Sequence, residues 1–514
     1  MKTFAAPGVT VLNSGNTTSP ASAFSAAADF LRLNPFRALA ISAAVLIPCF
    51  WHRRIEAGDL ASHTYNAWLA QLTERGQAPG LWLAKQWNNV LFDMSLIRLG
   101  ALAGLGLAEK ICVSAAVLIF FWGAFAMISA ISHRTPWSLT PCIAMFAYGW
   151  TFQQGFLNYY ISLGLAFFGI ALLQRGRGLE RALILALLAL AWMAHPLGAA
   201  LLLGIGFYVV AAAKTKARNQ PLLFTGAAFL LIGVSNYIVS HYPVFWPDRA
   251  TLQAFLTHSG ADQLLLYSAR YRLPSDLLVA FVPICIAVDA YFRRKREEPC
   301  SIYALPLQLY GLAFLAGILL PSAVQLSAYA APLGFLQARL TSVTAVFGCC
   351  LLGTVRPQKW HLPCLAAITV IFFLLLYGDT GKLNKMEEQI ENYARAIPPG
   401  QRVIANIGPV PGSRLLISHI VDRACIGQCF SYGNYEPSSG QFRVRAHPGN
   451  PFVISDSSGF NQIEGGSYVV RAEDLPISGI YRCKMNEADL CMRELKVGER
   501  NGLEDVQRVA TPIR

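Results

Sequence analysis

Residues 111–132 read ICVSAAVLIFFWGAFAMISAIS and contain no charged side chain. A helix needs about 20 apolar residues to cross the hydrocarbon layer of a membrane, so this run is long enough for one span. About 11 such runs can be drawn along the chain. They begin near Ala38, Ala108, Ser138, Gly155, Leu179, Leu197, Pro221, Asp276, Ile302, Gly334 and Leu362. The sequence therefore predicts a mostly α-helical, polytopic membrane helix bundle of about 11 spans.

The charged residues support this prediction. Of the 514 residues 14% are charged and 54% are hydrophobic, whereas about a quarter of a soluble domain is charged. Residues 379–514 carry 16 basic and 16 acidic side chains, and residues 1–378 carry 26 and 13. The net charge of +13 therefore lies among the apolar runs, which is typical of topology signals and not of a nucleic-acid-binding surface. We expect membrane lipids, and no nucleic acid, as partners.

The positions of the basic residues predict the orientation. With a cytoplasmic N-terminus, 16 Lys and Arg residues fall in cytoplasmic segments, and the short outer loops near Phe152, His195 and Gln325 hold none. The cytoplasmic basic residues are Lys2, Arg32, Arg37, Arg134, Arg175, Arg177, Arg181, Lys214, Lys216, Arg218, Arg293, Arg294, Lys295, Arg296, Arg356 and Lys359. We therefore expect a multi-pass protein of the cell inner (plasma) membrane. An odd number of spans places the C-terminal domain outside the cytoplasm.

The runs divide the chain into three parts, and the second part contains two long outer loops. They are a disordered cytoplasmic lead at 1–35, a transmembrane domain at 36–378 with a first outer loop at 53–107 and a second at 241–275, and an extracytoplasmic α+β domain at 379–514. The first loop contains two amphipathic helical patterns, one after Asp59 and one from Val90 to Leu99, joined by the turn Pro79-Gly80. The last domain contains a helical pattern near 382–396 and then short β-like runs at 402–407, 441–445, 467–471 and 479–483.

Four cysteines lie in the last domain, namely Cys425, Cys429, Cys483 and Cys491. An even number of cysteines outside the cytoplasm favours two disulfides. Local pairing, of Cys425 with Cys429 and of Cys483 with Cys491, is one of three connectivities. A four-thiolate zinc site is the alternative, although the short spacings within each pair fit zinc poorly.

Asp59 lies shortly after the first span, where a side chain can meet both water and lipid headgroups. An Asp before a helix start is commonly an N-cap that accepts a backbone hydrogen bond. His63 is four residues further on and shares a helix face with Asp59. A carboxylate and an imidazole on one face suit proton abstraction or metal binding, and they also suit a plain hydrogen bond.

Three segments carry a resemblance to a known family. They are 56–68 (EAGDLASHTYNAW), 155–165 (GFLNYYISLGL) and 194–197 (AHPL). A first span followed by an acidic residue that heads a loop of two surface helices resembles the GT-C superfamily of integral membrane glycosyltransferases. The resemblance covers roughly Phe36 to Lys214, and the later spans match in layout only.

The resemblance implies an enzyme of the mannosyltransferase or arabinosyltransferase kind. Such an enzyme takes a sugar from a polyprenyl-phosphate-sugar donor on the outer face and transfers it to a glycan, lipid or protein acceptor. A carboxylate of the first loop acts there as the general base, and Asp59 matches that residue. The superfamily often has a second acidic residue or a metal near the base. Glu56 and His63 are the candidates here, and a divalent metal is the one cofactor left open.

The leaving group implied by the resemblance is a lipid phosphate, so cations must meet its developing negative charge. The candidates are Arg53, Arg54, Lys85, Arg270, Arg272 and Arg339. Arg339 lies near the outer end of an apolar run, where it either holds a phosphate or extends to the membrane interface. Arg270 and Arg272 flank Tyr271 and fit either a phosphate site or a solvated surface.

Uncharged polar residues at outer helix ends are candidates for binding the hydroxyls of a sugar or acceptor. They are Gln153, Gln154, Asn158, Tyr159 and His195. Interfacial anchoring is the alternative for Tyr159, and helix capping is the alternative for His195.

Two other functions stay open, namely a secondary transporter or lipid flippase and a non-catalytic membrane scaffold with a partner-binding outer domain. The sequence contains neither G-x-x-x-x-G-K-[ST] nor a strand-borne G-x-G-x-x-G motif. This argues against an ATP-driven pump and against a soluble type of nucleotide-sugar enzyme.

Overall fold

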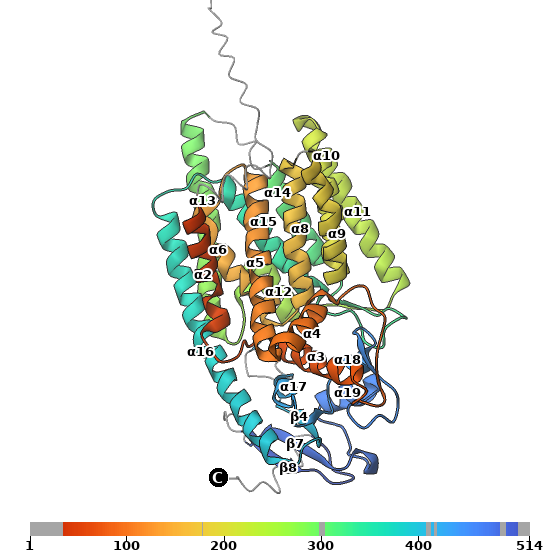
Figure 1. Cartoon of the computed structure of the whole chain (residues 1–514). Coiled ribbons are helices and arrows are strands. Elements are labelled where there is room, and N and C mark those ends of the chain that lie inside the picture. The colour runs from red at the N-terminus through yellow and green to blue at the C-terminus, as the bar shows by residue number, and fades with distance from the viewer. Residues whose placement is uncertain are drawn as a thin grey trace, which may run out of the picture.

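The computed structural model describes residues 34–176, 178–297, 304–407, 413–415, 419–483 and 490–501. Figure 1 shows a bundle of long helices with a smaller domain of strands and short helices at one end. Helix α16 (His361–Ala396) runs from the bundle into that domain and joins the two. Residues 1–33 of the predicted disordered lead, and Arg177, lie outside the described residues.

Each of the predicted apolar runs contains a helix. Among the described residues, seven helices are long and apolar enough to cross a membrane, namely α5 (Leu105–Ser132), α8 (Leu157–Arg175), α10 (Pro196–Lys214), α11 (Gln220–His241), α13 (Arg272–Lys295), α15 (Leu336–Thr354) and α16. The other runs form α2 (Pro35–Phe50), α6 (Thr140–Ala147), α9 (Leu179–Ala194) and α14 (Ala304–Leu319). A helix of 16 residues, such as α2, rises only about 24 Å, which is less than the hydrocarbon thickness of about 30 Å. The helical membrane bundle is therefore supported, and the count of about 11 spans is not confirmed.

Helices α5 and α8 pack closely because two glycines meet where they cross. A Cβ atom at Gly123 would lie 2.3 Å from the carbonyl oxygen of Gly164, and one at Gly164 would lie 2.7 Å from that of Ile119. Small residues allow such close approach of membrane helices. The contact fixes α8, whose first turn contributes to the site described below.

The predicted pair of helices in the first loop is present as α3 (Leu60–Glu74) and α4 (Leu91–Ala103). Between them lies a short strand that was not predicted, β1 (Leu81–Leu83), which pairs antiparallel with β6 (Val444–Ala446) of the C-terminal domain. The first loop and the C-terminal domain therefore lie at the same end of the bundle (Figure 1).

The C-terminal domain contains a mixed sheet with the strand order β5-β4-β7-β8. Its strands are β4 (Arg402–Asn406), β5 (Phe430–Ser431), β7 (Ile477–Arg482) and β8 (Leu490–Glu494). Strand β4 is parallel to both β5 and β7, and β8 is antiparallel to β7. The short helices of the domain are α17 (Ile420–Ala424), α18 (Glu436–Ser439) and α19 (Ser457–Glu464).

The predictions for this domain are met in part. The runs at 402–407 and 479–483 correspond to β4 and β7, and the run at 441–445 overlaps β6. The run at 467–471 forms only an isolated bridge between Val469 and Arg500. The helix expected near 382–396 is the continuation of α16.

Both disulfides have the local connectivity. Cys425 is bonded to Cys429, and Cys483 is bonded to Cys491. The four-thiolate zinc alternative is therefore not what the structure contains.

The remaining elements connect the bundle helices, except for the last one in chain order, which lies in the C-terminal domain between α19 and β7. They are η1 (Trp137–Leu139), α7 (Trp150–Gln153), η2 (Ala217–Asn219), β2 (Val244–Phe245), α12 (Arg249–His258), η3 (Ala261–Leu264), η4 (Ala269–Tyr271), β3 (Ala323–Val324) and η6 (Ala472–Asp474). Basic residues predicted to be cytoplasmic meet at the end of the bundle away from the C-terminal domain, where Arg134 and Arg293 both donate to the Thr354 carbonyl, at 3.3 and 3.2 Å.

Candidate functional site

Asp59 occupies the N-cap position of α3, but its side chain makes no capping hydrogen bond. Its backbone amide instead donates to the Gln154 carbonyl at 3.0 Å. Gly155 follows with a φ of +84°, and a Cβ atom there would lie 2.4 Å from the Asp59 amide nitrogen. Only glycine fits this position. The contact between the first loop and the start of α8 holds the Asp59 backbone, and the Asp59 carboxylate is not used to cap α3.

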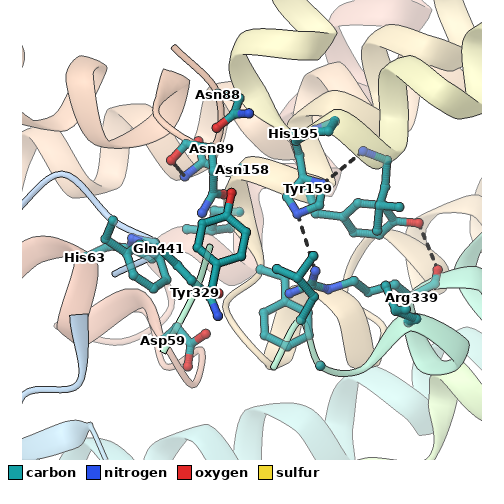
Figure 2. Close-up of a pocket in the computed structure, with 18 of the residues that line it drawn as sticks. Asp59, His63, Asn88, Asn89, Asn158, Tyr159, His195, Tyr329, Arg339 and Gln441 are labelled. Carbon is teal, nitrogen blue, oxygen red and sulfur yellow. Dashed lines mark hydrogen bonds between the residues drawn. The ribbon is translucent and has the colours of Figure 1, made fainter. Parts of the chain in front are cut away.

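A cavity with about 880 Å³ of space, partly open to solvent, lies where the first loop, α8, α10, α15 and the C-terminal domain meet. The residues labelled in Figure 2 that line it are Asp59, His63, Asn88, Asn89, Asn158, Tyr159, His195, Tyr329, Arg339 and Gln441. Figure 2 shows Asp59 and His63 on one side of the cavity and Arg339 with His195 on the other. The cavity is therefore electrostatically polarised.

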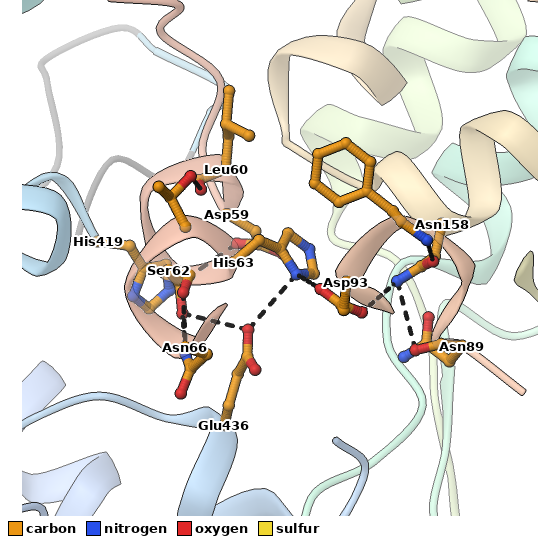
Figure 3. A network of polar contacts seen from close by, with 12 residues as sticks. Asp59, Leu60, Ser62, His63, Asn66, Asn89, Asp93, Asn158, His419 and Glu436 are labelled. Carbon is orange, nitrogen blue, oxygen red and sulfur yellow. Dashed lines mark hydrogen bonds and ion pairs between the residues drawn. The ribbon is translucent and has the colours of Figure 1, made fainter. Parts of the chain in front are cut away.

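The side of the cavity around His63 is a hydrogen-bonded network (Figure 3). His63 Nδ1 lies 2.7 Å from Asp93 Oδ1 and 3.5 Å from Glu436 Oε1. The second oxygen of Asp93 accepts a hydrogen bond from Asn158 Nδ2 at 2.8 Å. The Asn158 side-chain oxygen accepts one from the Phe92 amide at 2.8 Å. These partners fix the orientation of both the imidazole and the Asn158 amide.

His63 is positively charged at neutral pH. Burial alone would lower the pKa of His63, but the carboxylates of Asp93, Glu436 and Asp59 outweigh it and raise the pKa to about 9. A protonated imidazole donates hydrogen bonds and cannot accept a proton. His63 therefore serves as a fixed positive charge beside Asp59, and not as a base.

We expect the stability contribution of His63 to fall as the pH rises. The pKa of the imidazole is 6.5 in the unfolded chain and about 9 in the fold, so the folded state holds the proton more tightly. The resulting stabilisation, about 3 kcal/mol, is complete below the unfolded pKa and is lost as the pH rises through the folded one. The melting-temperature difference between wild type and His63→Gln should shrink between about pH 6 and about pH 10. A difference that grows over this range would contradict the assignment.

The Asp59 carboxylate lies in a partly dehydrated environment. It is 15% exposed, its Oδ1 atom is 3.8 Å from His419 Nε2, and it accepts a hydrogen bond from the Tyr435 hydroxyl. Burial raises the pKa of Asp59, and the positive charges of His419, His63 and Arg339 oppose this rise without cancelling it. A carboxylate with a raised pKa is a better proton acceptor near neutral pH than an ordinary aspartate.

His419 links Asp59 to the interior of the C-terminal domain. Its Nδ1 atom lies 3.6 Å from Asp422 Oδ2, and its ring lies 4.7 Å from the ring of Tyr435. Burial would lower the pKa of His419, but the carboxylates of Asp422 and Asp59 raise it above the usual value. The C-terminal domain therefore places next to Asp59 an imidazole whose protonated form the neighbouring carboxylates favour.

Arg339 forms the opposite side of the cavity. Its guanidinium lies 4.2 Å from the ring centre of Phe156 and 5.7 Å from that of Tyr159, so both aromatic faces support the charge. Within the described part of the chain no carboxylate forms an ion pair with it, and its Nε atom is buried without a hydrogen-bond partner. A partly buried guanidinium without a carboxylate partner is suited to binding an anionic ligand.

His195 caps α10 and also contacts Arg339. Its Nδ1 atom accepts a hydrogen bond from the Leu197 amide at 3.2 Å, and its Nε2 atom lies 3.3 Å from Arg339 Nη1. A neutral imidazole has one acceptor nitrogen, so only one of these contacts can be a hydrogen bond at a time. His195 therefore occupies the capping position of α10, which was the alternative prediction for it, and it also faces the cavity.

Six of the predicted site residues line this cavity, namely Asp59, His63, Asn158, Tyr159, His195 and Arg339. Gln153 and Gln154 are buried beside it, and the Gln153 side-chain oxygen accepts a hydrogen bond from the Tyr267 hydroxyl at 2.8 Å. Lys85 and Arg272 are exposed and do not line the cavity, and Arg270 is paired with Asp379 at 2.9 Å.

Glu56, Arg53 and Arg54 also lie away from the cavity. Glu56 and Arg54 belong to a buried ionic network, defined here as Arg54, Glu56, Glu109, Glu387 and Arg423. Arg53 is exposed and lies 3.2 Å from Glu391 of α16. The physical reason is that the chain between α2 and α3 passes along α16, so its charged side chains meet α16 before the chain reaches Asp59.

Four residues around Asp59 and His63 were not predicted, namely Asp93, His419, Tyr435 and Glu436. Asp93 lies in α4, and the other three come from the C-terminal domain. Asp93 had a signal, because it is an acidic residue in the first turn of a predicted loop helix. The positions of the other three follow from tertiary packing and had no local signal.

A metal is not supported by the geometry. Among the described residues there is no group of three or more His, Cys, Asp or Glu side chains arranged to hold a metal ion.

Comparison of the chain with protein-family models, curated proteins and solved structures returned no match. The function is therefore inferred from the cavity itself and from the three quoted segments. All three segments contribute to the cavity, through Asp59 and His63, through Asn158 and Tyr159, and through His195.

Proposed function

We propose that the protein is a membrane glycosyltransferase that moves a sugar from a polyprenyl-phosphate carrier to an extracytoplasmic acceptor. One observation carries the proposal: Asp59, the base that the resemblance implies, and Arg339, one of the candidate phosphate-binding residues, line the same cavity from opposite sides. The proposal places the C-terminal domain outside the cytoplasm and the protein in the cell inner (plasma) membrane.

The proposed reaction is a single displacement. The Asp59 carboxylate removes the proton of an acceptor hydroxyl, and the resulting oxygen forms a bond to the anomeric carbon of the sugar. The bond from that carbon to the phosphate oxygen breaks, and its electron pair leaves with polyprenyl phosphate. Because attack and departure occur on opposite faces of the carbon, the anomeric configuration is inverted.

The electrostatics of the cavity suit both ends of this displacement. The raised pKa of Asp59 favours proton uptake near neutral pH. Arg339 lies partly buried beside His195 and the rings of Phe156 and Tyr159, where it can meet the negative charge that develops on the leaving phosphate. Asn158 lines the cavity with its amide held by Asp93 and by the Asn89 carbonyl, and Asn88, Gln441 and Tyr329 also line the cavity. Amides and hydroxyls of this kind are suited to sugar hydroxyls.

The test is an assay of purified protein in proteoliposomes with polyprenyl-phosphate-mannose or polyprenyl-phosphate-arabinose as donor. Wild type should release polyprenyl phosphate when a glycan acceptor is present. Movement of the intact donor between leaflets without cleavage would instead identify a flippase. Binding of the donor with neither cleavage nor movement would favour the scaffold.

Arg339→Gln is expected to slow this release by about 100- to 1,000-fold, because the developing phosphate charge loses its cation. The matched control is Arg249→Gln, which removes an exposed arginine at the start of α12. Rates are compared at saturating donor, so that weaker binding alone does not account for the loss. Equal rates in Arg339→Gln and wild type would remove Arg339 from the mechanism.

A further inference from the structure

A second cavity lies outside the site described above, in the groove between the end of α2 and the middle of α16. It holds about 1130 Å³ of space, partly open to solvent. Four Lys or Arg side chains line it, Arg53, Arg54, Lys382 and Lys385, against the single acidic side chain of Glu388. This groove shares no lining residue with the cavity of Asp59.

The groove lies where the two helices leave the apolar part of the bundle. The apolar run of α16 ends at Tyr377, and charged residues follow from Asp379. The His52 ring stacks on Tyr377 at 4.7 Å, and the Trp51 ring lies 5.4 Å from Tyr377. Aromatic clusters of this kind are typical of the boundary between hydrocarbon and headgroups. The groove is therefore at the depth of lipid headgroups.

Three of the four cations are available to a ligand. Arg54 is committed to the buried ionic network, since it lies 2.8 Å from Glu387. Arg53 is 66% exposed and Lys382 is 70% exposed, and the ion pairs that they form with Glu391 and Asp379 are of the weak, solvated kind.

Lys385 adds a third available charge. It is exposed, and within the part of the chain that the structure describes it forms no ion pair. Together with Arg53 and Lys382 it gives the groove a local excess of positive charge.

Hydrogen bonds hold the segment after α2 against α16 at the groove, and glycines of α16 leave space within it. The Asn384 side chain accepts a hydrogen bond from the Arg54 amide at 3.0 Å and donates one to the Arg54 carbonyl at 3.1 Å, which ties the end of α2 to α16. A Cβ atom at Gly378 would meet no atom within 4 Å, whereas one at Gly381 would lie 3.2 Å from the His52 ring. The glycines leave room between the cations.

The membrane side of the groove presents apolar side chains to lipid. Ile47 and Phe50 of α2 are 58% and 57% exposed, and Val370 and Leu374 of α16 are 57% and 67% exposed. In a bilayer these surfaces contact acyl chains. A ligand in this groove can therefore bind with an anionic head between the cations and with its tails along the two helices.

We propose that this groove binds the headgroup of an anionic phospholipid of the surrounding bilayer. Basic pockets between membrane helices recognise such headgroups through charge, with about one kcal/mol, or roughly a five-fold change in affinity, for each Lys or Arg. The site is separate from the donor phosphate site, which contains Arg339. It does not depend on the proposed enzymatic function, and it gives Arg53 a role in lipid binding that is separate from donor binding.

The test is native mass spectrometry of the full chain, titrated with dioleoyl-phosphatidylglycerol or dioleoyl-phosphatidylcholine in detergent. The triple variant Arg53→Gln, Lys382→Gln, Lys385→Gln should weaken binding of the anionic lipid by roughly 100-fold and leave the zwitterionic lipid unchanged. The control Lys85→Gln, Arg249→Gln, Arg272→Gln removes the same charge from exposed positions outside the groove. Gly378→Trp fills the floor without changing charge and should also prevent binding.

Each other outcome would overturn the proposal. Unchanged affinity in the groove variant, or an equal loss in the control variant, would show that the lipid binds by general attraction. Retained binding in Gly378→Trp would place the lipid outside the groove. Full competition by millimolar inorganic phosphate would identify a free-phosphate site. Melting temperatures in lipid-free detergent, expected to be similar for all variants, exclude misfolding as the cause of a loss.

Discussion

Asp59→Asn is expected to reduce the release of polyprenyl phosphate by about 100- to 10,000-fold, which is the range for loss of a general base. Asparagine has nearly the same shape as aspartate but cannot accept the proton of an acceptor hydroxyl. The substitution should leave the fold intact, because the Asp59 side chain does not cap α3 and its backbone contact with Gln154 is retained. The measurement is the single-turnover rate with polyprenyl-phosphate-mannose, beside the melting temperature of each protein.

The matched control is Asp276→Asn, which removes a 64% exposed carboxylate that is paired with His258 near the start of α13. This variant should transfer at the wild-type rate. Asp59→Glu retains a carboxylate at a shifted position and should keep part of the rate. The wild-type rate should fall as the pH drops through the raised pKa of Asp59, whereas the residual rate of Asp59→Asn should lack that dependence. Equal rates in Asp59→Asn and wild type would refute the proposed base.

The membrane bundle was predictable from the sequence because a helix that lies in lipid needs a long run of apolar residues. The first-loop helices α3 and α4 were predictable for a related reason, since their apolar residues recur with helical spacing. Span length was less predictable, because hydropathy does not show where a helix ends. The segment after Ser138, for example, forms the eight-residue helix α6.

The candidate site was predictable only where the chemistry lies in local patterns. Asp59 and Arg339 could be singled out because a charge beside or within an apolar run is costly unless it has a role. His419 and Glu436 could not, because they reach Asp59 and His63 through the folding of a domain that begins more than 300 residues after Asp59 in the sequence. Arg54 and Glu56 were predicted to belong to the site, and this prediction was wrong. They are close to Asp59 in the sequence, but they do not line the same cavity.

The buried ionic network explains how the C-terminal domain is held in place beside the cavity. Arg423 of α17 donates to Glu387 of α16 at 2.6 Å and to Glu109 of α5 at 2.7 Å, and it lies 3.5 Å from Glu56 of the first loop. Burial opposes the charged form of Arg423, but the three carboxylates raise its pKa well above the usual value. One side chain of the domain thus neutralises charges from three other parts of the chain.

Arg423→Met is therefore expected to destabilise the protein by about 3–5 kcal/mol, because it leaves buried carboxylates without their cation. The domain should separate from the bundle before the bundle unfolds, since α17 loses its main polar contact with α5, α16 and the first loop. The measurement is thermal unfolding in detergent together with limited proteolysis near residues 397–401, which connect α16 to β4. Transfer activity should fall as well, because Tyr435, which lines the cavity, and Glu436, which contacts His63, move away with the domain.

Two further variants separate loss of the ion pairs from loss of packing. Arg395→Met removes a 64% exposed arginine that lies 3.6 Å from Glu391, and it should cost less than about 1 kcal/mol. The triple variant Arg423→Met, Glu109→Gln, Glu387→Gln removes the unpaired charges and should recover much of the stability lost in Arg423→Met, because replacing a whole buried ionic group is less costly than breaking it. A cost below about 1 kcal/mol for Arg423→Met, or a triple variant less stable than the single one, would show that packing and not charge holds the domain against the bundle.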